Sequence, residues 1–590
     1  MPVPIRLLPA LLASTLLACA TPTPPTPTTA APTPTSTAFA TWTPATFARA
    51  KAEQRLIIVT VVTQWCHWCH VMDEKTWRDP AIAALVADRF VVVRVDADAR
   101  PDLAERYADY GWPAVALLTS TAEPVTAWRG YREARAFEAE LRGYIADVDA
   151  GRAIVAAVAD VVVDKRPLAV VRDVMRAQLD RFYDVEVGGW GRPQKYPLWA
   201  PLAVALHEIG SGDPSRATQL ATTLDGELGL IDDVDGGMFQ YSLGGVWSAP
   251  HVEKLAEVNG NALRVFADAI RWRHEPRWRH GGDEIARYLT TTLRRADGAF
   301  FANQDADRAF YERPTREARA AVSAPFIDRH VFASHNGRIA AGLARFGAAT
   351  GQPALVDAAA VAVDVILTNH RVGTGFTHDE GTVDDDVLHL VDQVAMGNAL
   401  IELAEATGDR RYRTEARATA HFILDVLEDK AGGFFAHTVV DSDVGVFSQR
   451  RMPFALNAEA ARLLLHVGRL EHDDDLVAAA DRALARFADV NVVAAEYRAI
   501  GEMLLAADER LHEPLRFSVV TKNIDNDDSR ALLAAVNAQA VPHRLVDVQL
   551  PGDNYPDLGH AVVYVCGESF CSAPVKDPST LPGVTARFTR

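Results

Sequence analysis

Cysteine is scarce in this sequence, with 5 residues among 590. Cys19 lies in the first segment, and the other four form two close pairs, Cys66/Cys69 and Cys566/Cys571. Once Cys19 is set aside, no thiol lacks a neighbour, which is typical of an exported protein in an oxidising compartment. We expect Cys566 and Cys571 to close a small structural disulfide.

A surplus of positive charge is also missing. The chain has 60 Lys and Arg residues against 78 Asp and Glu residues, which gives a net charge of -18. This balance argues against nucleic acid and against an anionic membrane surface as partners. Hydrophobic residues make up 49% of the chain, so its length provides for several domains with large cores.

The apolar stretch near the N-terminus, Leu7–Leu17, is too short to span a bilayer. It ends in Leu16-Leu17-Ala18-Cys19, which is similar to a bacterial lipobox. We therefore expect residues 1–19 to be a lipoprotein-type signal peptide, with lipidation at Cys19 as the protein's only membrane attachment. The protein would then be anchored in the cell envelope. A plain secretory signal is the alternative. Residues 20–42 are expected to form a Pro/Thr-rich linker.

The stretch from Trp65 to His70 reads Trp-Cys-His-Trp-Cys-His. It follows the β-type run Leu56–Val62 and precedes residues with a helical pattern. A Cys-x-x-Cys at a strand-to-helix junction is typical of the redox motif of thioredoxin-like folds. Because free amide groups at a helix start favour a thiolate, Cys66 is the predicted attacking thiol and Cys69 the resolving thiol.

The same residues allow two other interpretations, a c-type haem attachment or a zinc site. A second signal favours the redox motif: Gly111-Trp112-Pro113 precedes the strand-like Ala114–Leu118, and thioredoxin-like folds place a cis-proline there. Pro113 is therefore expected to shape the substrate groove, although an ordinary trans turn remains the alternative. Trp65 and His67 complete the predicted redox site, and no cofactor or metal is predicted.

Three regions differ in pattern. Residues 43–150 read as an α/β unit with the strand and helix order of a thioredoxin-like fold. Residues 151–514 contain long amphipathic helices, separated by Gly-Gly-aromatic loops such as Gly188-Gly189-Trp190 and Gly432-Gly433-Phe434. This repetition predicts an α/α toroid of six helical hairpins, with a generic helical array as the alternative. Residues 515–590 return to α/β. The predicted fold class is therefore multidomain.

Several motifs resemble those of the spermatogenesis-associated thioredoxin-like family, and they occur in the family's order. They are Cys66-His67-Trp68-Cys69-His70, Gly111-Trp112-Pro113, Pro193-Gln194-Lys195-Tyr196-Pro197, Pro250-His251-Val252-Glu253-Lys254, Gln304-Asp305-Ala306-Asp307 and Ser334-His335-Asn336-Gly337. The resemblance implies a thioredoxin-like domain joined to a six-hairpin α/α barrel, similar to those of N-acylglucosamine epimerases and several glycoside hydrolases. It does not define an activity.

Four residues are candidates for a barrel site: His251, Glu253, Asp305 and Asp307. If their loops converge at one mouth of the toroid, the carboxylates could serve as acid and base on a small carbohydrate. The structural alternative is that the aspartates cap helices and that His251, Glu253 and Lys254 form a buried polar network.

The predicted function is thiol–disulfide exchange on a protein thiol or disulfide. A carbohydrate-active barrel, epimerase-like or glycosidase-like, is the first alternative. A non-catalytic binding protein with a structural cysteine pair is the second.

Overall fold

The structure is a computed structural model, and it describes residues 36–155, 162–210, 213–380, 387–440 and 443–589. The predicted lipidation site at Cys19 and the signal peptide lie outside the described residues. Within them, no helix combines the length and the apolar character that crossing a bilayer requires.

A five-stranded sheet organises the N-terminal domain, in the order β1-β3-β2-β4-β5. Strands β1, β3 and β2 run parallel to one another, β4 is antiparallel to β2, and β5 is antiparallel to β4. The strands are β1 (Phe39–Ala40), β2 (Leu56–Val62), β3 (Phe90–Asp96), β4 (Ala114–Leu118) and β5 (Pro124–Arg129). The sheet therefore begins inside the range 20–42 that the sequence assigns to a linker. That assignment is wrong for its last residues, because a two-residue strand is too short to show a pattern.

The central strand β2 is buried on both faces, which explains why all its residues except Thr60 are apolar. Ile57 and Val59 face one hydrophobic cluster, which includes Phe47 of α1 and Leu103 of α4. Ile58 faces the other, with side chains from α2, α3 and α5. The helices are α1 (Pro44–Ala52), α2 (His67–Met72), α3 (Pro80–Arg89), α4 (Pro101–Ala104) and α5 (Ala134–Asp149). Helices thus cover both faces of the sheet, as in a thioredoxin-like layer fold.

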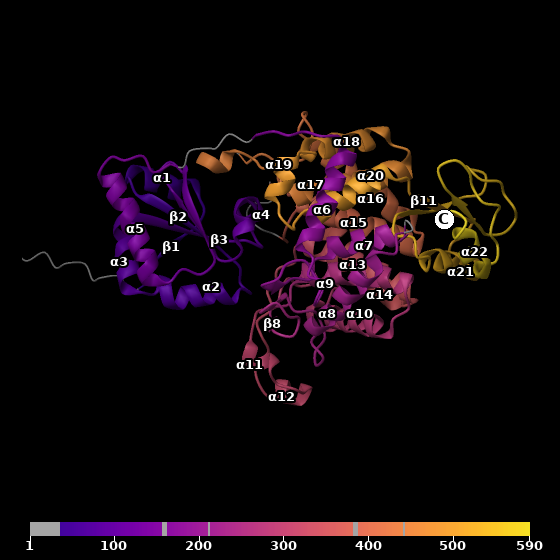
Figure 1. Cartoon of the computed structure of the whole chain (residues 1–590), viewed down its shortest axis with the longest axis horizontal. Coiled ribbons are helices and arrows are strands. Elements are labelled where there is room, and N and C mark those ends of the chain that lie inside the picture. Colours follow the sequence, from indigo (N-terminus) through magenta and orange to yellow (C-terminus); the bar gives the residue numbers. More distant parts are fainter. Residues whose placement is uncertain (1–35, 156–161, 211–212, 381–386, 441–442, 590) are drawn as a thin grey trace, which may run out of the picture.

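Six helices form the inner ring of the central domain, and each contacts the next until the last contacts the first. They are α7 (Trp199–Gly210), α9 (Ala256–Trp272), α13 (Ala333–Thr350), α15 (Leu390–Thr407), α17 (Phe454–Glu471) and α20 (Gly501–Leu511). Each also contacts at least one outer helix. The outer helices are α6 (Leu168–Phe182), α8 (Arg216–Glu227), α10 (Pro276–Tyr288), α14 (Pro353–Asn369), α16 (Arg410–Phe422) and α18 (Asp474–Phe487). These contacts confirm the predicted toroid of helical hairpins, and Figure 1 shows its helices packed together beside the N-terminal domain.

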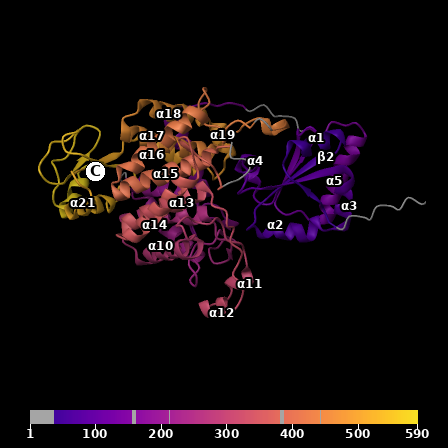
Figure 2. The ribbon, with the colours of Figure 1, turned by 180° about the vertical axis from the view of Figure 1, so that it is seen from behind.

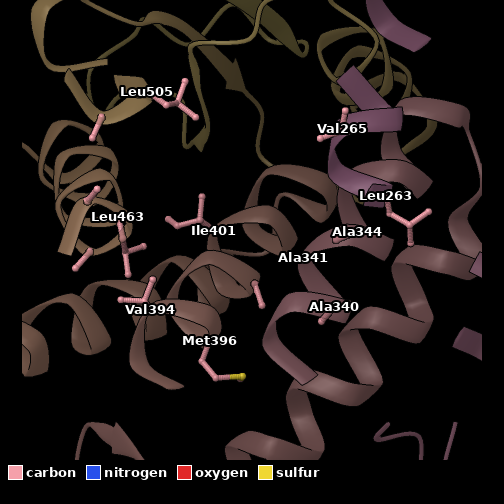
Figure 3. Close-up of a cluster of buried hydrophobic side chains, with 14 of the residues drawn as sticks. Leu263, Val265, Ala340, Ala341, Ala344, Val394, Met396, Ile401, Leu463 and Leu505 are labelled. Carbon is pink, nitrogen blue, oxygen red and sulfur yellow. The ribbon is translucent and has the colours of Figure 1, made fainter. Parts of the chain in front are cut away.

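Buried aliphatic side chains hold the inner ring together. Figure 3 shows such side chains converging from five inner helices, with Leu263 on α9, Ala344 on α13, Met396 on α15, Leu463 on α17 and Leu505 on α20. All of them belong to one hydrophobic cluster. Their burial is the main stabilising contribution to the barrel.

The same pair of side-chain hydrogen bonds fixes the loop that precedes each of four inner helices. In α9, α13, α15 and α17 the fourth residue is an amide side chain. This side chain makes two hydrogen bonds to one residue of the preceding loop, the one that follows a glycine or alanine. The side-chain oxygen accepts from the amide of that residue, and the side-chain nitrogen donates to its carbonyl oxygen. The pairs are Asn259 with Met238, Asn336 with Phe300, Gln393 with Phe376, and Asn457 with Phe434. These bonds satisfy buried backbone groups and fix the loops at the barrel mouth.

The C-terminal region forms a small sheet in the order β12-β11-β13. Its elements are β11 (Leu515–Val520), α21 (Asp527–Asn537), β12 (Arg544–Gln549) and β13 (Val562–Cys566). Cys566 and Cys571 form the predicted disulfide, with a sulfur–sulfur distance of 2.05 Å. Helix α21 contacts α13 and α15. Figures 1 and 2 both place this region at the end of the barrel opposite the N-terminal domain, so this disulfide is far from Cys66.

Candidate functional site

The cysteine pair lies at the start of α2. Cys66 is the N-cap residue, and its sulfur accepts a hydrogen bond from the amide of Cys69 at 3.2 Å. The two cysteines are not joined by a disulfide. Both are buried, with exposed fractions of 5% for Cys66 and 1% for Cys69. Burial raises the pKa of the Cys69 thiol well above its usual value. The two thiols are therefore unequal: Cys66 has a helix-start amide directed at it, and Cys69 keeps its proton.

The loop before β4 lies against this pair. The peptide bond between Trp112 and Pro113 is cis, and the thiol of Cys66 donates to the carbonyl oxygen of Trp112 at 3.5 Å. Trp65 and Val62 join both cysteines in a small hydrophobic cluster, and Trp112 and Leu255 pack against it. Leu255 precedes α9, so the barrel supplies part of the wall around the sulfurs.

A cleft of about 670 Å³ lies between the N-terminal domain and the barrel, and Cys66 is on its lining. The N-terminal domain contributes Trp65, Trp68, Asp98 and Trp112, and the barrel contributes Tyr241, His251, Glu253, Asn303 and His335, among others. Both views place the end of the domain that carries α2 and α4 toward the barrel (Figures 1 and 2). The redox pair and the barrel mouth thus form one site.

His251 and Glu253 form a buried pair on the barrel side, with 2.9 Å between Nδ1 of His251 and Oε2 of Glu253. The imidazole stacks on Tyr241 at 4.6 Å, and it lies 6.1 Å from the exposed ring of His67. Burial, with a smaller contribution from His251, lowers the pKa of His67. Lys254 belongs to a different network, because its ammonium group donates to Asp232 and to the carbonyl oxygen of Gly236.

The other two barrel candidates do not line this cleft. Asp307 is the N-cap of the short helix α11 (Arg308–Tyr311) and accepts from the amide of Phe310, which is the structural alternative considered for it. Asp305 lines a separate cavity, where it lies 3.7 Å from His70. The four predicted barrel residues therefore do not form one constellation, because only the strand segment that carries His251 and Glu253 borders the cleft.

Asp98 is a residue of this site that the sequence does not reveal. Its Oδ2 accepts from Nε1 of Trp65 at 2.6 Å and from Nδ2 of Asn303 at 2.9 Å. Its carbonyl oxygen lies 2.6 Å from Nε2 of His378. Asp98 thus joins the residue next to Cys66 to two residues of the barrel. A carboxylate just beyond a buried strand was the only sequence signal, and it is a weak one.

The titration of Asp98 gives a testable consequence. Burial first, and then the nearby charge of Asp96, raise the pKa of Asp98 to about 7, against about 3.9 in an unfolded chain. The folded protein therefore binds more protons than the unfolded chain between these values, and this carboxyl group lowers stability progressively as pH rises from about 4 to about 7. We expect Asp98→Asn to weaken the fall in melting temperature between pH 5 and pH 8. The exposed Asp109→Asn variant is the control, and an equal change in both variants would contradict the assignment.

A barrel loop fixes the two domains together. Phe447 is only 4% exposed and belongs to the hydrophobic cluster of the N-terminal domain. Its ring lies 4.4 Å from that of Trp42. Beside it, the amide of Val446 donates to the carbonyl oxygen of Ala122, and Arg451 donates to the carbonyl oxygen of Arg106, both at 3.1 Å. These contacts attach the N-terminal domain to the barrel on which the other wall of the cleft lies.

Metal ligation finds no support in this geometry. Across residues 36–155, 162–210, 213–380, 387–440 and 443–589, no three His, Cys, Asp or Glu side chains converge in a way that would hold an ion. The cluster of Cys and His residues at positions 66–70 instead spreads out, because His67 and His70 are exposed while both sulfurs are buried.

Residues 30–146 match the family Thioredox_DsbH, whose description is "Protein of unknown function, DUF255". The chain is 26% identical over 302 residues to spermatogenesis-associated protein 20 of Homo sapiens, and 26% identical over 298 residues to an uncharacterized protein of Caenorhabditis elegans. The predicted resemblance to the spermatogenesis-associated family is confirmed. Each match covers 45% of this chain, and 38% and 41% of these two relatives, so the chain spans about two fifths of the length of the curated relatives it matches.

Among solved structures, the chain is similar to a cellobiose 2-epimerase from Bacillus thermoamylovorans, with a TM-score of 0.43 and 11% identity over 53% of this chain and 85% of the epimerase. It is also similar to a glycoside hydrolase family 76 mannosidase from Bacteroides thetaiotaomicron, with a TM-score of 0.43 and 12% identity over 58% of this chain and 99% of that enzyme. Likeness at this level says nothing about the chemistry of the barrel.

Proposed function

We propose that this protein catalyses thiol–disulfide exchange at Cys66 and Cys69. The observation that carries the proposal is the sulfur of Cys66, which lies at the first turn of α2, accepts the Cys69 amide and lines the cleft. Amide donors at a helix start stabilise a thiolate, and the thiolate is the attacking form. A purely structural staple would not need an opening in front of one sulfur.

The reaction has two steps. The thiolate of Cys66 attacks one sulfur of a substrate disulfide, so that the substrate bond breaks, a mixed disulfide forms and one substrate thiol leaves. Cys69 then loses its proton and attacks the sulfur of Cys66, which releases the second substrate thiol. The pair becomes a disulfide, and the substrate gains two electrons and two protons.

The variant Cys69→Ser tests this order of events. Without the resolving thiol, the mixed disulfide on Cys66 is expected to accumulate to near one equivalent and to be visible by intact-protein mass spectrometry. Under the same conditions iodoacetamide should modify Cys66 of the reduced, folded protein faster than Cys69, because Cys69 is almost fully enclosed. Failure of the variant to form the mixed disulfide on Cys66, or alkylation of Cys69 before Cys66 in the parent protein, would contradict the proposal.

A carbohydrate-active barrel is the second candidate. The observation that favours it is the buried pair of His251 and Glu253, which lines the cleft beside the stacked rings of Tyr241 and Tyr196. Small-molecule sites combine aromatic walls with a few precisely placed polar groups. A screen of glycosides and reducing sugars with the parent protein and Glu253→Gln would support this candidate only if turnover occurs and depends on Glu253.

A further inference from the structure

The cleft restricts what can reach Cys66. The cysteine is 5% exposed, and Leu255 of the barrel packs against the cluster that surrounds it. A folded protein would have to separate the two domains before its disulfide could touch this sulfur. The cleft volume of about 670 Å³ lies instead in the range of pockets for small molecules.

The charge of the cleft favours cations. Four carboxyl groups line it, from Asp98, Asp109, Glu253 and Glu257, and Arg129 supplies the one guanidinium group among its lining residues. With Asp98 half-protonated near pH 7, carboxylates still outnumber the guanidinium. Two guanidinium groups beside the cleft reduce the negative charge without removing it: Arg338 lies 3.4 Å from Glu257, and Arg498 lies over the ring of Tyr196. The net charge of -18 acts in the same direction.

Aromatic rings supply a second feature that suits a cation. The cleft is lined by six of them, namely Trp65, Trp68, Tyr110, Trp112, Tyr196 and Tyr241. Tyr241 is stacked between Tyr196 and His251, Arg498 lies over Tyr196 and Arg129 lies over Tyr110. The rings left for a ligand are therefore those of Trp65, Trp68 and Trp112. Aromatic faces attract ammonium groups, and they do so more strongly where water is partly excluded. Rings and carboxylates therefore favour the same kind of ligand.

We infer that the substrate of this site is a low-molecular-weight disulfide that carries positively charged amino groups. This inference rests on the proposed thiol–disulfide exchange and gives its substrate class. Cys66 attacks the substrate disulfide as described above. The amino groups of the substrate lie against the carboxylates and rings of the cleft, and both substrate halves leave as thiols while Cys66 and Cys69 become a disulfide.

Single-turnover oxidation of the fully reduced protein tests the inference without an added reductant. Three disulfides serve as probes: cystamine, which is cationic; bis(2-hydroxyethyl) disulfide, which is neutral; and oxidised glutathione, which is anionic. Each rate is divided by the rate of the same disulfide with free dithiothreitol, which removes differences in intrinsic reactivity. We expect normalised rates in the order cationic, neutral, anionic, with at least about a tenfold difference between the extremes at low salt. Added salt should reduce that difference.

The double variant Asp109→Asn/Glu257→Gln provides the specific test, because both side chains are exposed and their replacement leaves the buried site intact. It should reduce the preference for cystamine over oxidised glutathione several-fold, with a smaller effect on the rate of the neutral disulfide. Equal normalised rates for all three disulfides, or faster reduction of insulin than of cystamine, would overturn the inference and leave the proposed exchange standing. Failure of every disulfide, insulin included, to oxidise Cys66 and Cys69 would overturn the proposed function itself.

Discussion

Replacing Cys66 by serine is expected to reduce disulfide-exchange activity to the rate of buffer alone. The hydroxyl group of serine does not ionise at neutral pH, and exchange requires a sulfur nucleophile. The remaining Cys69 cannot replace it, because it is 1% exposed and burial holds its thiol in the protonated form. The measurement is the initial rate of cystamine and insulin reduction with dithiothreitol as the reductant.

The other cysteine pair provides the matched control. Cys566 and Cys571 form a disulfide at the far end of the barrel from the N-terminal domain. The double variant Cys566→Ser/Cys571→Ser should therefore keep the parent rate, although it removes the same number of sulfurs as a Cys66/Cys69 double variant. Substantial activity in Cys66→Ser would mean that the exchange chemistry lies elsewhere in the chain.

Much of the redox half of the site follows from local sequence. The apolar run of β2, the Cys-x-x-Cys at the strand end and the turn at Pro113 are each contained in a few consecutive residues, and the structure places them against one another. The barrel fold could also be predicted, because its Gly-Gly-aromatic loops repeat along the chain. Local patterns of this kind determine secondary structure and fold class well.

The contacts between the two domains could not be predicted from local sequence patterns. Asp98 contacts Asn303 and His378, more than two hundred residues further along the chain, and Phe447 enters a cluster formed by residues 47–122. Contacts between such distant residues produce no periodic pattern in the sequence. An isolated phenylalanine in a loop cannot be recognised as buried from its sequence neighbours. For the same reason the sequence grouped Asp305 and Asp307 with Glu253, although Asp307 only caps a helix.

The replacement of Phe447 by alanine is expected to weaken the attachment of the N-terminal domain to the barrel. The side chain is almost fully enclosed among Trp42, Phe47 and Tyr107, and truncation of a buried phenylalanine typically costs about 3–5 kcal/mol. Because the two domains have separate cores, the variant should unfold in calorimetry with an N-terminal transition that moves to lower temperature and separates from the barrel transition.

A functional measurement distinguishes loss of docking from simple destabilisation. If the cleft exists only while the domains are joined, Phe447→Ala should lose the preference for cystamine over oxidised glutathione and gain activity on insulin, because Cys66 becomes accessible to larger substrates. Phe570→Ala is the control: Phe570 is 65% exposed in the C-terminal region, and its removal should change neither property. Unchanged selectivity in Phe447→Ala, despite a lower melting temperature, would show that the barrel does not determine which disulfides reach Cys66.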